Sequence, residues 1–453
     1  MMDKNELSRR NFIGKVGYGT LAALAATSVP SYGTVFSKDA GKLAILGGKP
    51  VRANKAWPKW PQPDEKIVAK VLETTRSGIW CRIQSKTGTV PTFEEEYAKL
   101  LNTKYCVATG SGTQALSTCM EALGIGPGDE VITSPYTDMG TVSAILTSRA
   151  LPVLADLDPE AYQLDPDDVE RRITPNTKAI MPVHMMGQPC NMGRIMEIAR
   201  KHNLKVIEDS CQAQQAIYRG KNVGAIGDLG CFSFQSSKIM PCGEGGAIIG
   251  NDFDLMEQCF TVQNHGTNRK GKHVTIGPKY RMNEFEAAVL LGQMDSIVDR
   301  FHKRNENARY LNKRLKDFPG LRSQKLYEGT ESGSYYLYAM SYKKEHFNGI
   351  SREQFLKVMA AEGIGLSPYI PNGLHREAWI DHIVNLKSYK QLFGEKRLKE
   401  YREAMDLPNC DLVCSEMAMI WASGPLLAEK EDMDHIVNAI EKVYANRDQL
   451  KAI

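Results

Sequence analysis

The sequence predicts an α/β fold, in which a large domain with a mainly parallel sheet is followed by a smaller α+β domain. Two observations support this prediction. Short apolar segments alternate with amphipathic segments over roughly 150 residues, which is typical of a parallel sheet covered by helices on both faces. After residue 285 the pattern changes to one long helical segment, an alternating strand and amphipathic helices.

The large domain is expected to begin with a Pro- and Trp-rich extended segment and a short helix over residues 64–76. The hydrophobic pattern then predicts a strand beginning at Val107, followed by strands over residues 130–134, 152–156, 178–184, 204–209, 229–234 and 246–249. Helices are expected between these strands, among them residues 165–172 with Asp165 as the cap, and residues 193–202.

The smaller domain is predicted from three further segments. Residues 285–318 form a long helical pattern that would bridge the two domains, and residues 334–342 alternate like an antiparallel strand. Helices follow over residues 351–362, with Ser351 as the cap, and residues 429–446. The predicted organisation is a signal peptide and linker (1–40), a large domain (41–285), and a bridging helix with a small C-terminal domain (286–453).

The first 40 residues predict an export signal. Arg9 and Arg10 precede an uncharged segment, residues 16–37, with a modest apolar run and several small residues. This arrangement is typical of a twin-arginine signal peptide. The segment is too rich in Gly, Ser, Thr and Pro for a membrane span, which needs about 20 apolar residues. We therefore expect export to the periplasm without a transmembrane anchor; the alternative is a helix with two solvated arginines.

Composition excludes several other classes of protein. The 57 Lys and Arg residues nearly balance the 53 Asp and Glu residues, and the net charge of +4 is too small and dispersed for a nucleic-acid-binding surface. The ten cysteines include no CxxC pair and no zinc-site spacing, so neither a disulfide framework nor a metal is expected. Cys410 and Cys414 are interpreted as loop or core residues.

Four features of the large domain, taken together, indicate a reactive site. A glycine turn at residues 110–114 lies between a strand and a helix, where small residues and free N–H groups suit an anion. Asp209 ends a strand, at the edge where α/β sheets place ligand groups. Lys238 follows an apolar strand, and the Gly-rich residues 243–246 come directly after it.

These residue types fit one cofactor, pyridoxal 5′-phosphate. It needs a lysine amine for covalent attachment, an acid against its pyridine nitrogen and an anion site for its phosphate. Each feature taken alone has a simpler alternative: the glycine turn could be a plain turn, Asp209 a solvated carboxylate, and Lys238 a surface lysine.

From about Leu43 to the C-terminus, the chain resembles the DegT/DnrJ/EryC1/StrS sugar aminotransferase family of fold-type I pyridoxal-phosphate enzymes. The matching segments are residues 47–52, 110–116, 157–159, 182–189, 207–212, 227–238 and 280–282. The resemblance implies that Lys238 attaches the cofactor and acts as the catalytic base, that Asp209 pairs with the pyridine nitrogen, and that Gln212 lies beside the ring's phenolic oxygen. It also implies a phosphate site made by Gly112, Thr113, Gln114 and Ser233.

The chain departs from the family pattern at several positions. Asp138 stands where relatives place an aromatic residue that stacks on the cofactor, and we expect Asp138 on the substrate side. Either Tyr136 substitutes from two residues away, or the cofactor ring has no aromatic lid. Lys279 replaces an asparagine and is expected to reach the cofactor phosphate from a neighbouring subunit. Ile239 replaces an asparagine after the lysine. His184 is also assigned to the substrate side, with a core histidine as the alternative.

The resemblance implies transfer of an amino group from Glu or Gln to a keto-sugar or keto-cyclitol by a homodimer with active sites at the subunit interface. One alternative keeps the cofactor in a lyase, dehydratase or epimerase acting on a sugar. A second alternative is a non-catalytic exported protein that binds a sugar or a partner on the same scaffold.

Overall fold

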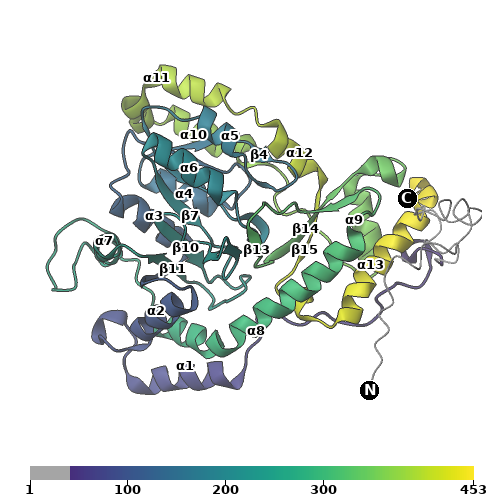
Figure 1. Cartoon of the computed structure of the whole chain (residues 1–453), viewed down its shortest axis with the longest axis horizontal. Coiled ribbons are helices and arrows are strands. Elements are labelled where there is room, and N and C mark those ends of the chain that lie inside the picture. Colours follow the sequence, from purple (N-terminus) through teal and green to yellow (C-terminus); the bar gives the residue numbers. More distant parts are fainter. Residues whose placement is uncertain (1–40, 453) are drawn as a thin grey trace, which may run out of the picture.

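A seven-stranded sheet forms the centre of the large domain in the computed structural model, which describes residues 41–452 (Figure 1). The strand order is β1-β11-β10-β7-β6-β2-β3. Neighbouring strands from β10 to β3 are parallel, whereas β11 is antiparallel to both β1 and β10. The bounds are β1 Tyr105–Thr109, β11 Gly246–Gly250, β10 Leu229–Ser233, β7 Lys205–Asp209, β6 Thr177–Met181, β2 Glu130–Thr133 and β3 Leu151–Leu154. The predicted mainly parallel sheet is confirmed.

Helices cover both faces of this sheet, because successive strand residues point to opposite sides and both sides are apolar. In β2, Val131 packs in the cluster that contains Leu116, whereas Ile132 packs in the cluster that contains Ile195. The first face is covered by α3 Gly112–Ala122, α4 Met139–Thr147 and α7 Phe253–Gln263, and the second by α2 Thr89–Leu100 and α6 Met192–His202. The short helix α5 Pro166–Arg171 begins at Asp165, whose side chain accepts a hydrogen bond from the Asp167 N–H as a cap.

The long helix α8 Glu284–Leu315 connects the two parts of the molecule (Figure 1). It begins with a capping box between Asn283 and Glu286. Near its start it packs against α1 Glu65–Ser77, and a Cβ at Gly292 would lie 2.6 Å from the Ile67 Cα, so only glycine allows this close approach. Near its end it packs against α13 Lys430–Ala445.

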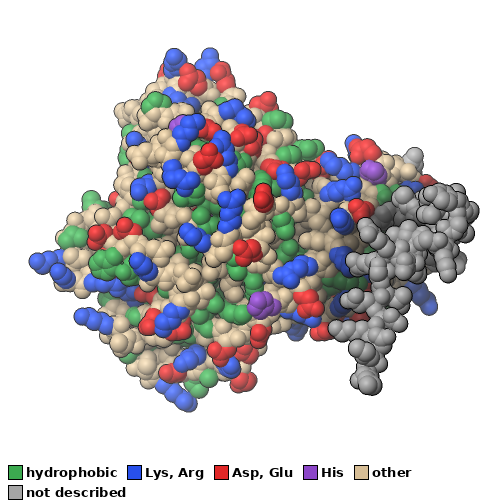
Figure 2. Space-filling view, in the orientation of Figure 1, with side chains coloured by type: hydrophobic (Ala, Val, Ile, Leu, Met, Phe, Trp, Pro, Cys, Tyr) green, Lys and Arg blue, Asp and Glu red, His purple; other side chains and the backbone are tan. Residues whose placement is uncertain are grey.

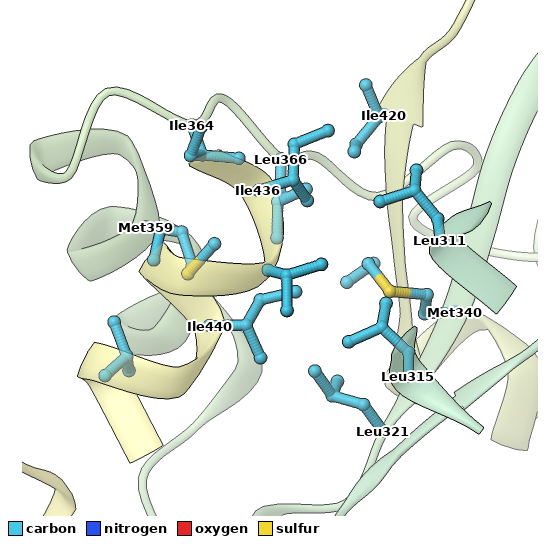
Figure 3. Close-up of a cluster of buried hydrophobic side chains, with 14 of the residues drawn as sticks. Leu311, Leu315, Leu321, Met340, Met359, Ile364, Leu366, Ile420, Ile436 and Ile440 are labelled. Carbon is cyan, nitrogen blue, oxygen red and sulfur yellow. The ribbon is translucent and has the colours of Figure 1, made fainter. Parts of the chain in front are cut away.

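The smaller part is an antiparallel sheet with helices packed on it. Its strands are β12 Leu321–Ser323, β14 Leu337–Tyr342 and β15 Met417–Trp421, and α9 Arg352–Ala361 begins with Ser351 as its cap. Figure 3 shows Leu311 and Leu315 of α8 facing Ile436 and Ile440 of α13 across this core. Short strands complete the described fold: β4 Leu157–Asp158, β5 Gln163–Leu164, β8 Ile217–Tyr218, β9 Lys221–Asn222 and β13 Thr330–Ser332.

Three helices between residues 379 and 416 have no counterpart in the sequence prediction. They are α10 Trp379–Asn385, α11 Lys387–Glu403 and α12 Pro408–Glu416. Helix α11 is strongly polar and is interrupted at Gly394, so its apolar pattern is weak. Contacts with the large domain hold it: the Tyr389 hydroxyl donates to the Ala150 carbonyl (3.1 Å), and Arg397 pairs with the buried Glu130 (2.7 Å). Cys410 and Cys414 are buried in α12, as expected for core residues.

The expected twin-arginine signal lies outside the described residues. Within residues 41–452, no helix has the length and apolar character needed to cross a membrane, and no group of His, Cys, Asp or Glu side chains is arranged to hold a metal ion. All ten cysteines are free. Figure 2 shows basic and acidic side chains interspersed over the face that is drawn, in agreement with the small net charge.

Candidate active site

A cavity of about 420 Å³ lies at the carboxyl ends of the parallel strands. Loops that follow β2, β6, β7 and β10 form one side of it, and aromatic residues from the smaller part form the other. The structure brings together seven residues that the sequence singled out: Gly112, Thr113, Asp138, Asp209, Gln212, Ser233 and Lys238. Three others, Gln114, His184 and Lys279, are not among the residues that line this cavity.

The glycine turn places the first turn of α3 against the cavity. Ser111 caps the helix, since its hydroxyl accepts a hydrogen bond from the Gln114 N–H (3.1 Å). A Cβ at Gly112 would lie 2.8 Å from both the Ser233 Cβ and the Cys211 Sγ, so the chain can approach Ser233 only without a side chain there. The N–H groups of this turn, with the Thr113 and Ser233 hydroxyls, form a surface suited to an anion.

The Gln114 side chain points elsewhere. A Cβ at Gly110 would lie 2.6 Å from the Gln114 Oε1, and this buried oxygen has no hydrogen-bond partner among the described residues. The Gln114 N–H is already used by the Ser111 cap.

Asp209 ends β7 with its carboxylate in the cavity wall, and the residue is 4% exposed. The Thr141 hydroxyl donates to Oδ2 (2.7 Å), and the Cys211 N–H donates to Oδ1 (3.2 Å). The Thr137 hydroxyl lies 2.8 Å from the Thr141 hydroxyl and extends this network. These two donors orient the carboxylate, which could then face a cationic group in the cavity.

Lys238 lies in an irregular loop beyond β10, and its Nζ is 4.4 Å from the centre of the Tyr336 ring. The Tyr336 hydroxyl in turn lies 2.8 Å from the Ser237 hydroxyl. The amine therefore lies against the face of the Tyr336 ring. Lys238 lines the same cavity as Asp209 and the glycine turn.

Gln212 connects the large domain to a loop of the smaller part. Its Nε2 donates to the Tyr369 hydroxyl (2.9 Å), and its Oε1 accepts from the Met186 N–H (2.9 Å). Burial raises the pKa of Tyr369, so its hydroxyl stays protonated and can donate into the cavity.

Asp138 is exposed and lines the cavity from the start of α4, where its Oδ1 accepts from the Gly140 N–H (2.8 Å). Tyr136 does not replace the missing aromatic residue: it is fully buried, its hydroxyl contacts the Met417 Sδ (3.0 Å), and it is not among the cavity-lining residues. Ile239 is likewise buried in the apolar core.

The aromatic residues of the cavity are instead Tyr336, Tyr369 and Trp421, all from the smaller part. The Trp421 ring lies 5.8 Å from that of Tyr336 and 6.2 Å from that of Tyr369. Sequence analysis missed all three, because nothing local distinguishes them from ordinary core aromatics.

His184 is a fully buried core residue. Its Nε2 lies 3.0 Å from the Glu208 carboxylate, and its Nδ1 accepts from the Cys190 N–H (3.0 Å), so Nε2 carries the proton. Its backbone N–H donates to the Asp209 carbonyl (3.1 Å). This geometry matches the alternative of a satisfied core histidine that supports the strand end.

Lys279 is exposed in the segment between α7 and α8, which extends away from the body beside α7 (Figure 1). It pairs with Asn264 in an isolated antiparallel bridge. A role toward the cavity of a second subunit stays a prediction.

Residues 61–440 match the DegT/DnrJ/EryC1/StrS aminotransferase family. A protein of Streptoalloteichus tenebrarius, named putative L-glutamine:3-amino-2,3-dideoxy-scyllo-inosose aminotransferase, is 34% identical over 431 residues, covering 90% of this chain and 99% of that protein. The L-glutamine:scyllo-inosose aminotransferase of Streptomyces griseus is 32% identical, covering 89% of this chain and 98% of that protein.

Solved structures show the same fold. The aminotransferase from Psychrobacter cryohalolentis has a TM-score of 0.77 at 28% identity, covering 87% of this chain and 100% of that one. The 3-amino-5-hydroxybenzoic acid synthase has a TM-score of 0.74 at 26% identity, covering 87% of this chain and 99% of that one. The architecture is thus that of the fold-type I aminotransferases, and the non-catalytic alternative is set aside. With these matches over most of its length, the chain belongs to the DegT/DnrJ/EryC1/StrS aminotransferase family and is an aminotransferase.

Proposed function

We propose that this enzyme uses pyridoxal 5′-phosphate to transfer the amino group of glutamine, or of glutamate, to the ketone of a cyclitol or sugar. The observation that carries the proposal is the convergence of Lys238, Asp209 and the Gly112 turn on one cavity. The names of the relatives, which specify glutamine and scyllo-inosose ketones, support the donor and the acceptor.

The residues around the cavity fit this cofactor. Lys238 supplies the amine for attachment, and Asp209 supplies a carboxylate for the pyridine nitrogen. The close packing of Gly112 on Ser233 keeps side chains out of the space where a phosphate would meet the N–H groups of α3. When bound, the cofactor supplies an electron sink for the carbon atom that gains or loses nitrogen.

Side chains of the protein would then orient the cofactor and the substrate and transfer protons. Once free, the Lys238 Nζ acts as general base and acid for the proton on the reacting carbon. Asp209, whose carboxylate is oriented by the Thr141 hydroxyl and the Cys211 N–H, would pair with the pyridine nitrogen. Asp138 and the Tyr369 hydroxyl offer an acceptor and a donor to the hydroxyl groups of a cyclitol.

The overall transfer is balanced without a further reactant. Glutamine leaves as its 2-oxo acid, and the acceptor ketone becomes an amine. A lyase or dehydratase would instead release water or another leaving group from the sugar.

Two wider features belong to this proposal. Export through a twin-arginine signal is supported by Arg9 and Arg10 and the uncharged segment that follows. A homodimer is supported by the exposed segment between α7 and α8, where Val274 and Ile276 are 60% and 89% exposed, because a second copy could cover these apolar side chains.

The test is a pair of half-reactions on purified enzyme loaded with pyridoxal phosphate. Glutamine should bleach the visible absorbance of the bound cofactor, and scyllo-inosose should restore it with formation of one amine for each 2-oxo acid. Lys238→Ala should abolish both changes, whereas Lys221→Ala, at an exposed lysine, should behave as wild type. An active, yellow Lys238→Ala variant would refute the assignment, and product without 2-oxo acid would favour elimination.

A further inference from the structure

The loop that carries Lys238 has little regular structure to fix it, since residues 234–245 contain only turns, bends and an isolated bridge. Within the loop, the Lys238 N–H donates to the Gln235 carbonyl (2.8 Å). A catalytic side chain must be held to a fraction of an ångström for efficient proton transfer. Contacts from outside the loop must therefore supply much of the restraint.

Two side chains from distant parts of the chain bind the peptide groups on either side of the Lys238 Cα. The Trp60 indole N–H donates to the Lys238 carbonyl (2.8 Å). The Ser423 hydroxyl donates to the preceding Ser237 carbonyl (2.9 Å). With the bond from the Lys238 N–H to Gln235, three polar backbone groups next to this Cα are hydrogen-bonded, and these bonds restrain the direction in which the Lys238 side chain leaves the loop.

One buried arginine of α8 contacts both Trp60 and Ser423. The Arg304 Nη2 donates to the Ser423 carbonyl (2.8 Å), and its guanidinium lies 4.9 Å from the centre of the Trp60 ring. Arg304 is fully buried, its Nε and Nη1 have no hydrogen-bond partner among the described residues, and burial lowers its pKa to about 9. A buried cation with so few partners is costly, so packing alone does not explain why it is there.

The backbone near Gly424 also keeps Trp60 in place. A side chain at Gly424 would collide with the Pro58 carbonyl oxygen, two residues before Trp60. The extended segment around residues 57–61 therefore lies directly on the turn after β15. Three distant parts of the chain thus restrain the Lys238 loop: the segment that contains Trp60, helix α8 through Arg304, and the turn after β15 through Ser423.

We propose that Trp60 is a positioning residue for Lys238: its indole N–H, supported by Arg304 and acting with Ser423, orients the Lys238 peptide so that the amine points into the cavity. This inference rests on the proposed function, in which Lys238 is the reacting lysine.

The test is Trp60→Phe, which keeps an aromatic ring over Arg304 but removes the N–H donor. Trp57→Phe is the matched control, because Trp57 is also half-buried in the same segment and stacks on a different arginine, Arg52, at 3.6 Å. Loss of one hydrogen bond should slow the loading of pyridoxal phosphate onto the apoenzyme by about 5-fold to 10-fold. Hydrogen exchange of the Lys238 amide in the apoenzyme should be faster in Trp60→Phe, and Trp57→Phe should resemble wild type in both measurements.

In the loaded enzyme, Trp60→Phe should lower kcat for the glutamine half-reaction by a similar factor and leave KM unchanged, and Ser423→Ala should reproduce this effect. Wild-type behaviour of Trp60→Phe, or equal slowing by Trp57→Phe, would overturn the inference. If wild-type enzyme fails to react with glutamine, the proposed function fails, while loading and exchange in the apoenzyme still decide the role of Trp60. If Lys238→Ala loads the cofactor as wild type does, both ideas fall.

Discussion

Replacing Gly112 by alanine tests the anion site most directly. The added Cβ would lie 2.8 Å from the Ser233 Cβ, well inside an ordinary carbon–carbon contact of about 3.5–4.0 Å. Cys211 could rotate its sulfur away, but Ser233 is anchored in β10, so the first turn of α3 must retreat by about 0.7 Å. Overpacking of this kind costs about 1–3 kcal/mol.

The displaced turn should bind phosphate less well. If most of that cost appears in cofactor binding, the Kd for pyridoxal phosphate should rise by roughly 5-fold to 150-fold, since 1.4 kcal/mol is a factor of ten. The affinity for pyridoxal, which lacks the phosphate, should change much less. Titration of the apoenzyme with both compounds measures the ratio.

Gly365→Ala is the control, because a Cβ there meets no atom within 4 Å and the residue is exposed. It should bind both compounds as wild type does. The reasoning is refuted if Gly112→Ala binds pyridoxal phosphate within about twofold of wild type, or if it loses affinity for pyridoxal to the same extent.

Two further predictions concern buried polar side chains. Thr141→Val removes the donor to the Asp209 Oδ2 without changing the shape of the side chain, and should destabilise the apoenzyme by about 1.5–3 kcal/mol in urea unfolding. The control is Thr75→Val, at an exposed hydroxyl that donates to a helix carbonyl, which should cost far less free energy of unfolding. Equal costs for the two variants would contradict the prediction. Burial lowers the pKa of His375 below its usual value of about 6.5, and this effect is stronger than the opposing effect of Asp411. The folded state therefore binds fewer protons at this site than the unfolded state. As a result, the protein loses stability as the pH falls below about 6.5. His375→Gln should show a smaller loss between about pH 7.5 and 5.5 in thermal unfolding, and an unchanged pH dependence would exclude His375 as the cause.

The alternation of strands and helices could be predicted from sequence because it depends on local order. Several strands of the sheet are apolar runs that end in polar residues or glycine, such as β1, β7 and β10, and parallel strands bring their carboxyl ends to one edge. For this reason the positions of Asp209 at a strand end and of Lys238 just beyond a strand predict that they lie at one edge of the sheet, and both line one cavity. Ser233, which the family resemblance assigned to the phosphate site, lines the same cavity.

Residues whose position depends on packing between distant segments could not be predicted in this way. Helix α11 has too weak an apolar pattern to be recognised, and it is held by Glu130 and Ala150 of the large domain. The sequence allows His184 to be either a substrate-binding residue or a core residue. Only the hydrogen bonds of its ring, to Glu208 and from the Cys190 N–H, show that both ring nitrogens are bonded within the core. Gln114 is a similar case, because its side-chain oxygen lies against Gly110 and the residue is not among those that line the cavity.

The family, the α/β class and the order of the reactive residues along the large domain are all encoded locally, because they depend on neighbouring residues and on motif spacing. The completion of the cavity depends instead on tertiary packing. Tyr336, Tyr369 and Trp421 reach it from the small part, and Trp60 reaches Lys238 across 178 positions of sequence. Such contacts exist only after α8 has joined the two cores, since no local pattern encodes which distant side chain will meet a loop that lacks regular structure of its own.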